Sequence, residues 1–138
     1  MPESMELIDL MERARTLSGK YENVIISRNN NHVLRMSRMT EPYFWHFHPN
    51  SDETFIGLDG TLILELENQR LELGPGQVFT VLKGSMHRTS PSGSWSVNLT
   101  VERADIETVP VEHPRVWGWQ KASFRKALGV AIRQAQPR

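Results

Sequence analysis

Short stretches in which apolar and polar residues alternate fill the middle of the chain. A period of two is typical of strands that bury one face. The alternation is clearest in residues 61–67, where Leu62, Leu64 and Leu66 are expected to point inward, and in residues 95–101, whose apolar face should be the buried one. Further strands are expected at residues 24–26, 32–39, 43–48, 53–58, 70–73 and 77–82.

Turn signals separate these strands. The pair Asp59-Gly60 is typical of a tight hairpin, and the Gly-Pro-Gly sequence at residues 74–76 predicts a sharp corner. Such signals recur about every eight to twelve residues, and about eight short strands result. The pattern therefore predicts an all-β sandwich or barrel.

The two ends of the chain depart from this pattern. Residues 4–18 have helical spacing, with Ser4 as the expected N-cap. The predicted apolar stripe would pack on the outside of the barrel and consists of Leu7, Leu10, Met11, Ala14 and Leu17. Beyond residue 104 the alternation weakens into an irregular arm, and residues 123–134 again have helical spacing. We expect one domain over residues 1–138, made of an N-terminal helix (1–20), a barrel (21–103) and a C-terminal arm and helix (104–138).

Composition limits the partners. The chain has 138 residues, a formal net charge of zero and a pI near 7.0, so no overall field attracts nucleic acid or an anionic membrane. It has no cysteine, no signal-peptide pattern and no apolar run near the ~20 residues of a membrane span. We expect a cytoplasmic protein without nucleic-acid or membrane partners. Trp117 and Trp119 in the arm must be covered by the barrel or by a second subunit, and we expect a homodimer.

Four side chains suggest a metal site. His46 and His48 are two apart on a predicted strand, so they point to the same face. Glu53 follows a turn that lets it fold back beside them, whereas period two sends the rival carboxylate Asp52 outward. A third histidine from another strand would complete a set of three imidazoles and one carboxylate, which suits a divalent first-row transition metal.

The same residues resemble the first sequence motif of the cupins, which has the form G-x5-H-x-H-x3,4-E-x6-G. His46, His48, Glu53 and Gly60 match it, while Thr40 replaces the leading glycine.

The second cupin motif has the form G-x5-P-x-G-x2-H-x3-N. Gly76, Gly84 and His87 stand at its spacing, while Leu82 replaces the proline and Pro91 the asparagine. The departures fall on turn positions. Residues 43–88 also resemble small single-domain cupins similar to mannose-6-phosphate isomerase.

This resemblance implies a double-stranded β-helix, or jelly roll, that binds one divalent metal ion. The ion would be iron, manganese, nickel, cobalt or zinc. The implied ligands are His46, His48, Glu53 and His87. We expect an enzyme of dioxygenase or isomerase type acting on a small oxygen-rich organic molecule; the alternative is a non-catalytic cupin that binds or senses a small molecule. The sequence identifies no general acid or base.

Other side chains have two readings. Tyr43, Trp45 and Phe47 could form a substrate platform, but packing on the far side of the strand is favoured. Arg35 and Arg38 could position an anionic substrate, but surface arginines on an edge strand are the favoured reading. His32 and His113 are expected to be exposed. Candidate pocket walls are Phe44, Met36, Trp95 and Met86.

Overall fold

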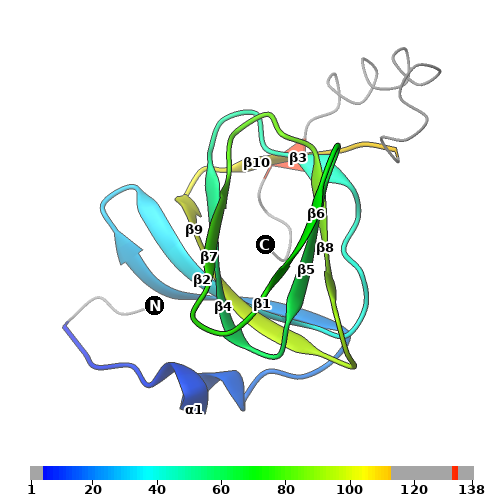
Figure 1. Ribbon diagram of the computed structural model, residues 1–138. Helices are drawn as coiled ribbons and strands as arrows, with labels where there is room; N and C mark the ends of the chain where they lie inside the picture. The colour runs from blue at the N-terminus through cyan, green and yellow to red at the C-terminus, as the bar shows by residue number, and fades with distance from the viewer. Residues whose placement is uncertain (1–4, 113–131, 134–138) are drawn as a thin grey trace.

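The computed structural model describes residues 5–112 and 132–133. Its strands form two antiparallel sheets that face each other around an interior (Figure 1). The first sheet contains β1 (Tyr21–Asn29), β2 (His32–Met39), β9 (Ser96–Arg103), β4 (Glu53–Asp59) and β7 (Val78–Val81), in that spatial order. The second contains β11 (Ile132–Arg133), β10 (Glu107–Pro110), β3 (His46–Phe47), β8 (His87–Pro91), β5 (Leu62–Leu66) and β6 (Arg70–Leu73), in that order. The predicted jelly roll is confirmed.

The five-stranded sheet turns apolar side chains outward. Met36 of β2 and Leu99 of β9 lie opposite each other and are buried outside the barrel, together with Ala14 and Leu17 of the N-terminal segment. That segment runs along the outer side of the sheet (Figure 1). Because strand side chains alternate between faces, the inner face of β2 and β9 is mostly polar. Its buried polar members are Arg35, Ser37, Ser96, Asn98, Thr100 and Glu102, and Val33 and Met39 are the buried apolar residues of β2 on the same face.

This arrangement corrects the expectation for residues 95–101. The apolar face is buried at Val97 and Leu99, but the polar face is buried as well, so the strand is covered on both sides. The ends of the apolar stripe are the exposed part, with Trp95 at 37% and Val101 at 36% of their full exposure. The apolar residues face the N-terminal segment rather than the barrel interior.

One part of the barrel interior is an apolar core. Phe55 of β4 packs there with Leu62 and Leu64 of β5, as the alternation predicted for both leucines, whereas Leu66 is only half-buried. The corner at residues 74–76 packs closely against Gly57. The backbone N–H of Gly76 donates a hydrogen bond to the carbonyl oxygen of Gly57, and a Cβ atom on Gly57 would overlap the carbonyl oxygen of Gly74. The other members of this core are Met39, Leu73 and Val81.

The N-terminal helix is shorter than predicted. α1 covers Leu10–Ala14, and Asp9 is its N-cap, accepting a hydrogen bond from the backbone N–H of Glu12. Residues 5–9 are not helical, and Leu7 is fully exposed. Because a short helix gains most of its stability from packing, only the part of the predicted helix that packs against the sheet is helical. Ser4 lies outside the described residues.

The C-terminal part also differs from the prediction. Residues 107–110, expected in an irregular arm, form β10 and pair with β3. Ile132–Arg133, expected at the end of a helix, form β11 and pair with β10. The remainder of the predicted arm and helix, with Trp117 and Trp119, lies outside the described residues.

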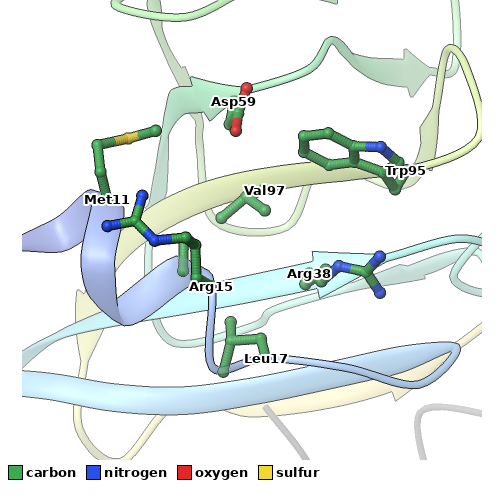
Figure 2. Close-up of a pocket in the computed structure, with 8 residues that line it drawn as sticks. Met11, Arg15, Leu17, Arg38, Asp59, Trp95 and Val97 are labelled. Carbon is green, nitrogen blue, oxygen red and sulfur yellow. The ribbon is translucent and has the colours of Figure 1, made fainter.

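A groove of about 480 Å³ lies between α1 and the outer face of the five-stranded sheet. Figure 2 shows Met11 and Arg15 at one side of it and Trp95, Val97 and Arg38 around the other. Two of the candidate pocket walls, Met36 and Trp95, therefore belong to the outer side of this sheet. Of the helices in residues 5–112, none has the length and apolar character that crossing a bilayer requires.

Candidate metal centre

Three strands bring the four predicted ligands together. β3 carries His46 and leads into His48, β4 begins with Glu53, and β8 begins with His87. β3 and β8 are paired so that His46 and His87 are direct cross-strand neighbours. One potential ligand atom from each of the four side chains lies within 4.8 Å of the others. All four residues are at most 2% exposed.

The loop between β3 and β4 is fixed on both sides. The Asn50 side chain donates to the carbonyl oxygen of Asp105 at 3.0 Å and accepts from the backbone N–H of Glu107 at 2.9 Å. On the other side, the N–H of Gly84 donates to the carbonyl oxygen of His48 at 2.8 Å. The turn that returns the chain from the histidines to Glu53 is thus tied to β10 and to the loop before β8.

Each histidine is oriented by a backbone carbonyl. Nδ1 lies 2.7 Å from the Phe44 oxygen in His46, 2.9 Å from the Glu107 oxygen in His48 and 2.9 Å from the Ser85 oxygen in His87. A carbonyl oxygen can only accept, so each Nδ1 carries the hydrogen. In a neutral ring, Nε2 then holds a lone pair, and this is the tautomer that binds metal.

The inward nitrogens converge on one carboxylate oxygen. Nε2 of His48 and of His87 lie 3.0 and 3.2 Å from Oε1 of Glu53. Lone pairs at these distances repel each other unless a proton or a metal cation lies between them. Burial lowers the pKa of His87 to about 4, against a smaller opposing effect of the Ser85 hydrogen bond, so this ring is neutral at pH 7. The donor set therefore fits a divalent metal ion.

The rival residues lie elsewhere. Asp52 is exposed, and its Oδ1 accepts from the backbone N–H of Lys83 at 2.9 Å. Glu53, by contrast, is fully buried and points inward, as the alternation predicted. His32 is exposed as expected, and His113 lies outside the described residues.

Aromatic rings border the histidines on one side. The rings of Tyr43 and Phe44 lie 5.2 and 5.3 Å from the ring of His46, and Tyr21 stacks on Tyr43 at 5.0 Å. Phe44 is 40% exposed, so this aromatic group connects the buried histidines to the surface. Tyr43 packs against another aromatic ring, as the favoured interpretation had it, but it does so beside His46 rather than on the far side of the strand, because residues 43–45 are not in a strand.

The other aromatic and apolar candidates pack away from the histidines. Trp45 is buried with the guanidinium of Arg88 5.4 Å from its ring centre. Phe47 packs with Met86 and Val109 in a separate cluster. Among the candidate pocket walls, Phe44 lies beside a predicted ligand, with its ring 5.3 Å from the ring of His46.

The buried ion pair between Arg35 and Glu102 on the inner face was not predicted from the sequence. Arg35 is 8% exposed and lies on β2, which is flanked by β1 and β9 and is no edge strand. Its Nε is 2.8 Å from Oε2 of Glu102. Burial raises the pKa of Glu102 to about 7, with Arg35 acting in the opposite direction. The available signal was the polar residue at every second position of residues 96–102.

Thr108 is a second residue that spacing could not reveal. It is fully buried on β10, and its hydroxyl oxygen lies 3.3 Å from Nδ1 of His48. Because β10 lies about sixty residues from His48 along the chain, only the pairing of the strands brings the two together. The side chain helps to hold the ring.

Comparison with known proteins agrees with this architecture. The family described as "Cupin domain" matches residues 37–98, which contain all four predicted ligands. A Bacillus subtilis protein named YdbB is 37% identical over 105 residues, which cover 75% of this chain and 92% of that protein.

Two solved structures show the fold. A cupin-2 domain protein from Shewanella frigidimarina has a TM-score of 0.67 and 21% identity, covering 70% of this chain and 94% of its own. A sugar phosphate isomerase of the cupin superfamily from Silicibacter pomeroyi has a TM-score of 0.58 and 13% identity, covering 68% and 67%. At these identities the likeness concerns the fold alone.

Proposed function

The chain belongs to the cupin superfamily, and we propose that it is a metal-dependent enzyme of dioxygenase or isomerase type that acts on a small oxygen-rich organic molecule. The observation that carries the proposal is the convergence of two imidazole nitrogens on Oε1 of Glu53 at 3.0 and 3.2 Å. That arrangement is repulsive unless a proton or a metal cation lies between the atoms, and a divalent ion satisfies all four side chains at once.

The residues that would hold the ion are His46, His48, Glu53 and His87. Three neutral imidazoles and one carboxylate leave a divalent ion with a net charge near +1, and iron, manganese, nickel, cobalt and zinc all accept these ligands. Bound there, such an ion polarises a carbonyl or enediol oxygen, or holds a substrate beside O₂.

The surrounding chain supplies orientation and exclusion of water. The backbone carbonyls that fix each Nδ1–H prevent the rings from turning. Burial of the four side chains keeps bulk water from the donor atoms. The rings of Tyr43 and Phe44 beside His46 offer an apolar wall for the substrate's carbon skeleton. A site of this kind suits a small molecule rather than a macromolecule.

Elemental analysis tests the proposal. Untagged protein purified without chelator, wild type beside His46→Ala, should contain about one transition metal ion per chain in the wild type and almost none in the variant. His32→Ala, which removes an exposed histidine, is the matched control and should keep its metal. Far-UV circular dichroism should show that all three proteins are folded.

The outcome also separates the classes of function. Absence of metal from the wild type after reconstitution would refute the enzyme proposal. With metal present, turnover of oxygen-rich substrates that is lost in His46→Ala supports an enzyme. Tight binding of a small molecule that is never converted favours the non-catalytic sensing alternative.

A further inference from the structure

Besides the three histidines, the buried charged side chains of residues 5–112 are Arg35, Glu53 and Glu102. All three lie on the inner face of the five-stranded sheet. The Nε of Arg35 contacts Oε2 of Glu102 at 2.8 Å, and its Nη1 donates to Oδ1 of Asn23 at 3.2 Å. The side chains of the ion pair are 10% and 0% exposed. The guanidinium is thus held in one orientation inside the barrel.

The register places this ion pair beside the predicted metal site. Thr54 of β4 lies opposite Val101 of β9, so Glu53 and Glu102 follow at the next position of each strand, at the same end of the pairing. Both side chains point inward, because the alternation that turns Thr54 and Val101 outward turns them in. The charged pair and the candidate metal carboxylate therefore lie on the same inner face of the five-stranded sheet.

Folding stability alone does not explain why an ion pair occupies this buried position. Burying two charges costs about as much as their attraction returns, and apolar residues of similar volume often stabilise a fold as well or better. The backbone ladder already joins β2 to β9 along their whole length. Polar side chains predominate on the surrounding inner face, with Ser37 donating to Asn98 at 3.2 Å, while Val33 lies opposite Glu102. A wall of this composition suits a polar ligand.

The charges indicate which ligand. When Glu102 is ionised, Arg35 and Glu102 cancel each other, while a divalent ion with Glu53 leaves one positive charge in a buried site. A single negative charge on the ligand would neutralise the pocket, whereas a neutral polyol would leave the positive charge uncompensated. The planar guanidinium is the side chain best suited to binding a carboxylate, and its contact with Glu102 shows that a carboxylate fits against it.

We propose that the substrate is a small monoanion, a carboxylate with a hydroxyl or keto oxygen next to it, and that Arg35 orients its carboxylate while the metal site holds the neighbouring oxygen. Glu102 and Asn23 fix the guanidinium for this task. The inference rests on the proposed metal-dependent function and narrows its substrate class.

Calorimetric titration with two matched probes tests the inference. Lactate and lactamide have nearly the same shape and differ by one negative charge. Metal-loaded wild-type protein should bind lactate about ten-fold or more tightly than lactamide. Metal content is measured on the same samples. Absence of metal therefore counts against the proposed function, whereas bound metal with no preference for lactate, or with no binding of either probe, overturns this inference alone.

Variants of the ion pair give effects of opposite sign. Arg35→Gln should weaken lactate binding by about ten-fold or more, because the orienting cation is lost and Glu102 repels the anion. Glu102→Gln should strengthen it, because Arg35 is no longer neutralised. A purely structural ion pair would instead shift both variants in the same direction, and that result would overturn the inference.

A charge-balanced variant guards against misfolding. Arg35→Gln combined with Glu102→Gln leaves the net charge of the pocket unchanged and keeps polar side chains at both positions. It should still bind lactate more weakly than the wild type does, because the orienting guanidinium is lost, and an unchanged affinity for lactate would overturn a direct contact with Arg35. The matched control is Arg88→Gln, which removes a half-buried arginine paired with Glu65 at 2.9 Å and should not alter binding of either probe.

Discussion

Acid should destabilise the metal-free protein through His87. The ring is fully buried, and burial lowers its pKa from an ordinary 6.5 to about 4. Between these values the unfolded chain takes up a proton that the folded protein does not. Stability contributed by the neutral ring is therefore complete above pH 6.5 and is lost as the pH falls toward 4.

The magnitude follows from the two pKa values. The difference between 6.5 and about 4 corresponds to about 3 kcal/mol of unfolding free energy. For a chain of this length, such a loss lowers the melting temperature by roughly 10 °C. Glu102, whose pKa is raised to about 7, has the opposite effect, since its contribution is lost as the pH rises from about 4.5 to 7. Comparison of variants is therefore needed to isolate His87.

The assay is chemical denaturation with a chelator present, at several pH values from 7.5 to about 4. His87→Gln removes the titrating group and should lose about 3 kcal/mol less than the wild type over this interval. His32→Gln removes an exposed histidine and should follow the wild type. Parallel curves for the wild type and His87→Gln would refute the reasoning, because they would show that His87 titrates alike in both states.

Three further predictions concern the scaffold. Gly57→Ala should destabilise the fold by more than about 2 kcal/mol in thermal melts, since the new methyl group overlaps the carbonyl oxygen of Gly74. Asn50→Ala removes two hydrogen bonds that tie the β3–β4 loop to β10, and competition with a chelator should show metal affinity reduced about ten-fold or more while the melting temperature falls only modestly. Light scattering should give the mass of a homodimer that Trp117→Ala together with Trp119→Ala dissociates; a wild-type monomer would contradict this.

The candidate site was predictable because its signals are local. The spacing of His46, His48 and Glu53 follows from strand alternation and a single turn, both of which the structure contains. Only His87 comes from a distant part of the chain, and it was placed by its resemblance to a cupin motif rather than by geometry. The cross-strand pairing of His46 with His87 explains why that motif lies where it does.

The orientation of the five-stranded sheet was not predictable in the same way. Alternation in residues 95–101 separates two faces but does not tell which one turns inward, because that depends on the N-terminal segment covering the apolar face. The prediction of a helix over residues 4–18 was wrong in its extent for a related reason. Its apolar stripe was correctly located at Ala14 and Leu17, but Leu7 finds no surface to pack on in the described structure.

The cover provided by the N-terminal segment explains how the barrel can hold polar groups inside. Ala14 and Leu17 bury Met36 and Leu99 on the outside of the sheet, so part of the apolar area that stabilises the fold lies beyond the barrel wall. The interior then needs an apolar core only where Phe55 packs against β5. The remaining inner surface is available for the histidines, for Arg35 and for Glu102, whose burial would be costly in a barrel that depended on its interior alone for stability.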